Sequence, residues 1–208
     1  MQIRKLPVRG FASNSWLVFD EESRMAAVID PSADAEVVLR LLREGNLTHS
    51  MILLTHGHFD HIFAADTLRA STGAPLMIHE KDAPMLTDAT LNASALFFGE
   101  GNVYKPADRL LHGGDALPLG NNIITVRHTP GHTEGSVCFV LPGRIFTGDT
   151  LFEGSIGRTD LPGGDERALN QSLRRIASMR GEYTLYTGHG NISTLAHERK
   201  NNPYLSNI

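Results

Sequence analysis

The strongest constraint on this sequence is a histidine-rich segment that directly follows an apolar run. Met51-Ile-Leu-Leu-Thr55 is continuous and apolar, as expected for a strand buried on both faces of a sheet. The next residues read H-G-H-F-D-H, from His56 to His61. Alternate residues of an extended segment point the same way, so His56 and His58 can address one metal ion. Asp60 and His61 follow where the chain turns toward a helix, so their side chains can point in another direction.

Three later segments repeat this arrangement of a strand followed by a polar residue beside glycine. They are Pro130-Gly131-His132-Thr133, Gly148-Asp149 and Gly188-His189-Gly190. Glycine lets the backbone turn sharply and approach a crowded centre. A single histidine after a strand is more often a surface residue, but four such strand ends in one chain indicate a shared metal centre. Neutral imidazole is the commonest metal ligand, and a carboxylate adds the negative charge that a divalent ion favours.

The composition limits the classes of protein to which this chain can belong. Its 208 residues, 41% hydrophobic and 20% charged, suit one globular domain. The formal net charge of −4 argues against a nucleic-acid partner. No apolar stretch approaches the roughly 20 residues that span a bilayer, and the N-terminus lacks the apolar segment of a signal peptide. The single cysteine, Cys138, excludes an intrachain disulfide, which fits a reducing compartment, and a cytoplasmic location is predicted. Cys138 itself lies mid-strand and is expected in the core.

The order of elements predicts two similar α/β halves. Strands are expected at Ile3–Val8, Trp16–Phe19, Met25–Ile29, Met51–Thr55, Pro75–Ile78, Asn122–Arg127, Ser136–Leu141, Arg144–Thr147 and Tyr183–Thr187. Helices are expected at Asp34–Arg43, Ile62–Ala70, Lys81–Leu86 and Glu166–Met179. Residues 87–106 show no clear period.

The motif T-H-x-H-x-D-H, followed in order by G-H-T, G-D and G-H-G, resembles the metallo-β-lactamase fold and, within it, glyoxalase II, the hydroxyacylglutathione hydrolases. The resemblance implies an α/β (α+β) protein built as a four-layer αβ/βα sandwich, with two mixed β-sheets and helices on the outer faces. It covers most of the chain, so residues 1–208 are expected to form one domain that lacks the C-terminal helical domain of full-length glyoxalase II.

The resemblance also implies two divalent metal ions and assigns their ligands. The set, called the ligand cluster below, is His56, His58 and His132 for the first ion, Asp60, His61 and His189 for the second, and Asp149 as the bridge. Three protein donors leave positions open for water, as in catalytic sites. A water shared by two cations loses its proton near neutral pH and becomes a nucleophile. Asp60 and Asp149, the carboxylates of this set, are also expected to be catalytic. Zinc is expected, with iron or manganese as alternatives.

The family points to a thioester substrate, S-lactoylglutathione or a similar 2-hydroxyacyl thioester, cleaved to D-lactate and free thiol by a metal-bridging hydroxide. A thiolate is a good leaving group, so no separate general acid is needed. Because the helical domain that binds glutathione is absent from the pattern, Arg158, Arg199 and Lys200 are the candidate substrate-binding residues. A structural ion pair of Arg158 with Asp160 and a solvated C-terminal tail are the competing interpretations.

Other activities within the same fold stay open. Persulfide dioxygenases share the segment around Gly157 and use a single iron, but their last motif is typically A-H-D, whereas this chain has Gly188-His189-Gly190. A lactonase is a further alternative. The remaining histidines, which lack a glycine-framed setting, are expected to be non-catalytic: His49, His79, His112, His128 and His197. The aromatic residues near the motifs are expected to wall the site or fill the core: Phe59, Phe63, Phe146 and Phe152.

Overall fold

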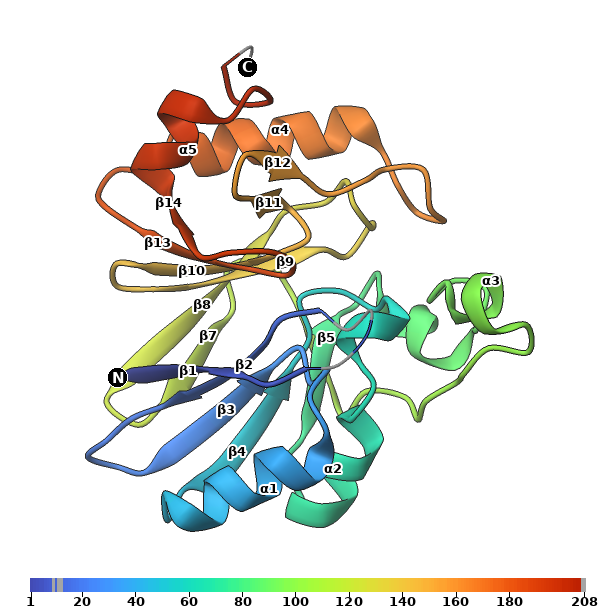
Figure 1. The fold of residues 1–208 in the computed structure, drawn as a ribbon, viewed down its shortest axis with the longest axis vertical. Coiled ribbons are helices and arrows are strands. Elements are labelled where there is room, and N and C mark those ends of the chain that lie inside the picture. The colour runs from blue at the N-terminus through green and yellow to red at the C-terminus, as the bar shows by residue number, and fades with distance from the viewer. Residues whose placement is uncertain (9, 11–12, 207–208) are drawn as a thin grey trace.

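Two mixed β-sheets pack face to face in the computed structural model, which describes residues 1–8, 10 and 13–206 (Figure 1). The first sheet runs, in order, β1 (Gln2–Leu6), β2 (Ser15–Phe19), β3 (Met25–Ile29), β4 (Thr48–Leu53), β5 (Leu76–His79) and β6 (Arg109–Leu111). The second runs β14 (Ser193–Thr194), β13 (Thr184–Thr187), β10 (Arg144–Gly148), β9 (Val137–Leu141), β8 (Asn122–His128) and β7 (Ala116–Leu119). A small hairpin, β11 (Leu151–Phe152) and β12 (Ser155–Ile156), stands beside the second sheet.

Helices cover the outer face of each sheet (Figure 1). The first sheet is covered by α1 (Ala35–Glu44) and α2 (Ala65–Thr72), and the second by α4 (Glu166–Ala177) and α5 (Leu195–Asn201). The short helix α3 (Ser94–Phe98) stands apart from both layers, and two 3₁₀ turns, η1 (Phe59–His61) and η2 (Ala83–Thr87), lie in the loops. The predicted four-layer sandwich with two mixed sheets is therefore confirmed.

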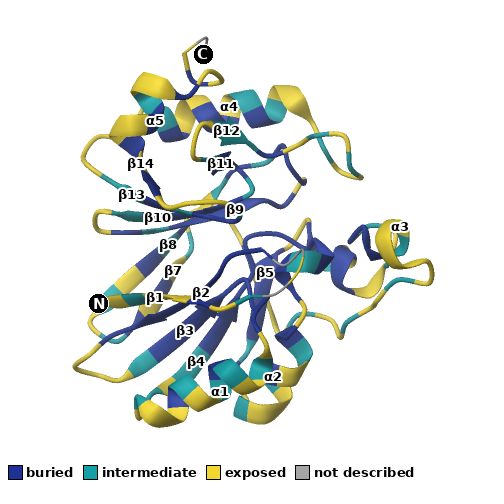
Figure 2. Ribbon diagram, viewed as in Figure 1, coloured by how far each residue is buried: buried dark blue, intermediate teal, exposed yellow. Residues whose placement is uncertain are grey.

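The layers follow from the two-residue period of the strands. In β2, Trp16 and Val18 belong to the core between the sheets, whereas Leu17 and Phe19 belong to the core beneath α1 and α2. The second sheet divides in the same way: Cys138 of β9 faces the core beneath α4 and α5, among buried leucines. Strands with apolar residues on both faces are buried on both sides, which explains the continuous apolar runs in the sequence (Figure 2).

The outer helices show the expected start signals and apolar stripes. The carboxylate of Asp34 accepts a hydrogen bond from the Glu36 N–H at the start of α1, and that of Asp165 accepts one from Ala168 N–H at the start of α4. Residues four apart, such as Leu169 and Leu173, are buried against the sheet. No helix in the described part of the chain is long and apolar enough to cross a membrane.

The predicted elements differ from the observed ones mainly where the chain is irregular. The helix expected at Lys81–Leu86 is a 3₁₀ turn, η2, and the helix expected from Ile62 begins only at Ala65 because η1 precedes it. The short elements that no pattern announced are α3, β6, β7, β11, β12, β14 and α5. Each has too few residues for a hydrophobic period to be read from the sequence.

Candidate metal centre

The fold brings all seven residues of the ligand cluster to the ends of strands at one edge of the sandwich. His56 to His61 follow β4, His132 follows β8, Asp149 follows β10, and His189 follows β13. Backbone hydrogen bonds join these loops to one another: Val137 N–H donates to Thr55 O at 2.8 Å, and Gly188 N–H donates to Gly148 O at 2.9 Å. The cluster is therefore fixed by both sheets together.

The first group of donors consists of three buried imidazoles. His132 Nε2 lies 2.9 Å from His58 Nδ1 and 3.2 Å from His56 Nε2. A zinc ion held tetrahedrally at about 2.1 Å by nitrogen separates neighbouring ligand atoms by about 3.4 Å. The spacing of the three nitrogens is close to that value, so the donor set fits a metal ion.

The second group consists of Asp60, His61 and His189, whose donor atoms lie within 4.8 Å of one another. His189 Nε2 is 3.1 Å from Asp60 Oδ2. Asp149 lies between the groups, because its carboxylate oxygens are 3.3 Å from His61 Nε2 and 3.6 Å from His132 Nε2. Gly188 makes room for it, since a Cβ at that position would overlap Asp149 Oδ1.

Hydrogen bonds outside the cluster set the tautomers of its imidazoles. His132 Nδ1 is 2.8 Å from the carbonyl of Arg158, and His61 Nδ1 is 2.9 Å from Asp30 Oδ2. Carbonyl and carboxylate oxygens only accept, so each Nδ1 carries a proton and Nε2 is the nitrogen that offers a lone pair when the ring is neutral. The Nε2 lone pairs of both rings therefore face the other cluster residues, which is how the outer hydrogen bonds of metal sites orient their ligands.

The electrostatics of the cluster also fit a cation. Burial lowers the pKa of His56 well below its ordinary value and that of His58 to about 3, so both rings are neutral donors. Burial also lowers the pKa of His61, but the carboxylates of Asp149 and then Asp60 outweigh it and raise that pKa well above its ordinary value.

The carboxylates of the centre have only histidines as possible cationic partners among the described residues. Among the described residues, no lysine or arginine forms an ion pair with Asp30, Asp60 or Asp149. His61 Nε2 and Asp149 Oδ1 are buried and have no hydrogen-bond partner in the described part of the chain. A buried group of this kind is costly unless a cation balances it, so the residues present fit bound metal.

Comparison with known proteins agrees with this centre. Residues 8–189 match the family model described as the metallo-beta-lactamase superfamily. The chain belongs to that superfamily. The matched segment contains the whole ligand cluster, from His56 to His189.

Three similar proteins illustrate the range of this superfamily. The hydroxyacylglutathione hydrolase GloC of Haemophilus influenzae is 35% identical, with 99% of each chain covered. The crystal structure of the BLEG-1 B3 metallo-beta-lactamase shares 36% identity at a TM-score of 0.92, over 99% of this chain and 100% of that one. The structure of TTHA1623 in a di-iron-bound form shares 36% identity at a TM-score of 0.84, over 97% and 100% of the two chains. The chain is a metal-dependent hydrolase of the metallo-β-lactamase fold.

Two buried carboxylates that support this superfamily centre were not singled out from the sequence. Asp30 accepts from both Thr55 N–H and Thr55 Oγ1, each at 2.7 Å, besides His61. Asp82 accepts from Gly135 N–H at 2.6 Å, Thr133 Oγ1 at 2.7 Å and Gly57 N–H at 3.2 Å. Asp82 thereby ties the loop that carries His56 to the loop that carries His132.

The structure separates the three candidate substrate-binding residues. Arg158 lines a hollow of about 280 Å³ beside the ligand cluster, and its guanidinium pairs with both carboxylate oxygens of Asp160 at 2.5 and 2.6 Å. Arg199 does not line this hollow: its guanidinium donates to the carbonyls of Ala177 and Met179 at the end of α4. Lys200 is exposed on α5 and also lies outside the lining. Of the three candidates, only Arg158 lines the hollow beside the cluster.

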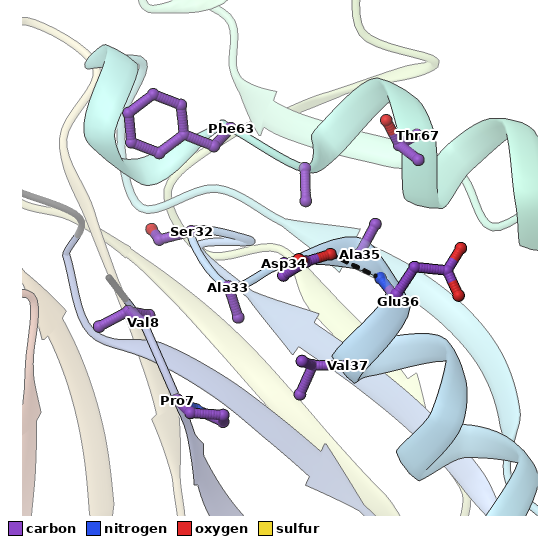
Figure 3. A pocket seen from close by; sticks show the side chains of 11 residues that line it. Pro7, Val8, Ser32, Ala33, Asp34, Ala35, Glu36, Val37, Phe63 and Thr67 are labelled. Atoms are coloured by element: carbon purple, nitrogen blue, oxygen red, sulfur yellow. Dashed lines mark hydrogen bonds between the residues drawn. The ribbon is translucent and has the colours of Figure 1, made fainter. Parts of the chain in front are cut away.

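A second hollow of about 520 Å³ lies between the end of β1, the start of α1 and Phe63 (Figure 3). Asp34 and Glu36 bring two carboxylates to it, and its described lining contains no histidine or cysteine. It therefore lacks the donors that distinguish the ligand cluster.

Among the histidines set aside, His79 and His128 stack on each other with their ring centroids 4.1 Å apart, and neither belongs to a group of described residues that could hold a metal ion. Cys138 is fully buried, and burial raises its pKa to about 11, as expected for a core thiol.

Proposed function

We propose that this chain, acting as one domain over residues 1–208, is a thioester hydrolase that cleaves S-lactoylglutathione or a similar 2-hydroxyacyl thioester to D-lactate and free thiol. The observation that carries the proposal is the position of Asp149 between two groups of three donors. Each group supplies three donors of its own, and the only further carboxylate is shared between the two groups, so water can complete both sites as in catalytic rather than structural centres. The substrate class is supported by the name of the GloC relative.

In this proposal the ligand cluster holds two divalent ions. His56, His58 and His132 would hold the first, and Asp60, His61 and His189 would hold the second, with Asp149 placed to serve both. Bound ions of this kind supply a water of lowered pKa and polarise a carbonyl oxygen. Zinc suits the donors, and iron is a second candidate because a similar protein is known in a di-iron form.

The residues of this chain then position the reactants. Asp60 and Asp149 are the carboxylates that line the hollow, so they orient the attacking water. The carbonyl of Arg158 holds the ring of His132 in place. Addition of water to the thioester carbonyl forms a C–O bond and breaks the C–S bond, and the departing thiolate takes up a proton from water. A thiolate leaves readily, which explains why the hollow needs no further acid.

The test combines metal analysis with two assays on purified protein. We expect two metal ions per chain by elemental analysis, and release of D-lactate and free thiol in equal amounts from S-lactoylglutathione without oxygen uptake. Oxygen uptake with glutathione persulfide, with no thiol released from any thioester, would instead identify a persulfide dioxygenase. Opening of a lactone ring by a protein that leaves thioesters intact would identify a lactonase.

A further inference from the structure

The lining of the hollow beside the ligand cluster is of two kinds. Five lining residues belong to the cluster: His58, Asp60, His132, Asp149 and His189. The other described lining residues are apolar except for Arg158: Phe59, Ala93, Phe97, Phe98 and Leu161. A thioester whose carbonyl lies at the cluster must therefore place a neighbouring group against apolar side chains.

The apolar lining includes three aromatic residues, called the aromatic wall here, in which the ring of the first contacts the rings of the other two: Phe59, Phe97 and Phe98. The Phe59 ring centroid is 5.0 Å from that of Phe97 and 5.2 Å from that of Phe98. Phe59 stands between His58 and Asp60 in the chain and is buried, so the wall begins at the cluster itself. Its outer rings lie on α3, which projects from the sandwich (Figure 1).

The outer part of the aromatic wall is open to solvent. Phe97 is 55% exposed and Phe98 is 51% exposed, and α3 is largely exposed in Figure 2. Contiguous exposed apolar surface is uncommon on soluble domains and usually marks a binding site. Because this surface continues directly into the hollow at the cluster, the occupant that fits it is a part of the substrate.

The charges of the hollow favour the same occupant. Arg158 is the only lysine or arginine among the described residues that line it, and its guanidinium is paired through Nε and Nη2 with the Asp160 carboxylate. Asp60 and Asp149 add negative charge to the same lining. A thiol carrier recognised through its carboxylates would find no unpaired cation in this lining, whereas an apolar group would find three rings.

We propose that the aromatic wall binds an apolar aliphatic or aromatic group of the thioester, so that the preferred substrates are thioesters with an extended apolar substituent. This inference rests on the proposed thioesterase activity and specifies its substrate class. The bond changes are those of simple hydrolysis: water adds to the carbonyl, the C–S bond breaks, and a carboxylic acid and a thiol are released.

The test uses two series of thioesters with the metal-loaded enzyme. In the first, the acyl chain of N-acetylcysteamine thioesters is lengthened from acetyl to octanoyl and to 4-phenylbutanoyl. In the second, the acyl group stays lactoyl and the thiol is lengthened from ethanethiol to hexanethiol. We expect kcat/KM to rise about two- to four-fold per methylene in one series, which identifies the side of the thioester that meets the wall.

Variants of α3 provide matched controls. In the double variant Phe97→Ala/Phe98→Ala, the dependence of kcat/KM on chain length should flatten. Leu96→Ala is the control, because Leu96 is 71% exposed on the same helix and does not line the hollow; it should keep the wild-type dependence. Calorimetric binding of non-hydrolysable thioether analogues should show the same trend in Kd, independently of turnover.

The outcomes separate this inference from the proposed function. If no thioester is hydrolysed, the proposed function fails. If S-lactoylglutathione is hydrolysed but neither series gains with length, or the double variant keeps the full gain, the thioesterase stands and the aromatic wall is not a substrate site. A dimer in sedimentation experiments that dissociates in the double variant, together with a flat length dependence, would assign the wall to self-association and overturn the inference.

Discussion

Replacement of Asp30 by Asn should remove the lone pair that His61 directs into the ligand cluster. Asp30 is 1% exposed, and its Oδ2 accepts from both His61 Nδ1–H and Thr55 Oγ1, while Oδ1 accepts from Thr55 N–H. An amide has a single acceptor oxygen, and Thr55 N–H has no alternative partner at that position. The amide nitrogen therefore takes the place of Oδ2 and directs an N–H toward His61 Nδ1. His61 can accept this hydrogen bond only if its own proton moves from Nδ1 to Nε2.

The magnitude follows from these contacts. The backbone is unaffected, because position 30 has φ of 49° and asparagine tolerates the left-handed region. Two hydrogen bonds to a buried carboxylate weaken, each worth about 1.5–3 kcal/mol, so the free energy of unfolding should fall by about 2–4 kcal/mol after partial compensation. Changes to such outer partners typically weaken metal binding by about 10–100-fold. The weakened ion is the one held by Asp60, His61 and His189.

The assay is zinc titration against a chromophoric chelator, with urea unfolding in parallel. Wild-type protein should bind two ions, and Asp30→Asn should bind one as tightly as wild type and one about 10–100-fold more weakly. The control is Asp20→Asn, in the turn between β2 and β3: Asp20 is also buried, and it accepts from Ser23 Oγ at 2.8 Å and Asn121 N–H at 3.1 Å. Two ions bound to Asp30→Asn with wild-type affinity, or an equal loss in Asp20→Asn, would refute the reasoning.

Three further predictions test other parts of the centre. Asp149→Ala should abolish hydrolysis and weaken both ions while unfolding stays cooperative, because Asp149 contacts both donor groups; near-normal turnover with two ions bound would contradict the bridge. Removal of metal by a chelator should abolish hydrolysis and lower Tm, because an ion present at a free concentration of 100 times its Kd adds about 2.7 kcal/mol to the free energy of unfolding. An unchanged Tm would show that the fold does not depend on metal. Glu198→Ala should lower the free energy of unfolding by about 3 kcal/mol, because its buried carboxylate accepts from Gly154 N–H and Asn202 Nδ2, both at 2.9 Å. Lys200→Ala, exposed on the same helix, is the control and should change it by less than about 0.5 kcal/mol in urea unfolding.

The sequence was sufficient to locate the ligand cluster because its residues obey a local rule. Each follows a strand, and strands with continuous apolar runs are recognisable without tertiary information. The edge at which those strands end is then shared by the two sheets, so His132 and His189 meet His56 although they are far apart in the chain. The ligand roles themselves stay predictions until metal is measured.

The C-terminal segment shows where the same reasoning failed. Arg199 was predicted to meet substrate because it is a cation near a family motif, yet it caps the carbonyls at the end of α4. Glu198 is buried instead and fixes the hairpin of β11 and β12, whose continuation supplies the Arg158 carbonyl to His132. Charge alone does not reveal which way a helical residue faces when the helix, α5, has only seven residues.

The carboxylates behind the cluster were beyond sequence reasoning for a related reason. Asp30 follows a strand, as the ligands do, but has no glycine or histidine beside it to mark a role. Asp82 follows no predicted strand at all, and its partners lie 25 and 53 residues away, at Gly57 and Gly135. Its importance comes from two loops that meet only in the folded sandwich. A motif can therefore name the atoms that bind metal, while the groups that hold those atoms in place depend on contacts that only the assembled sheets create.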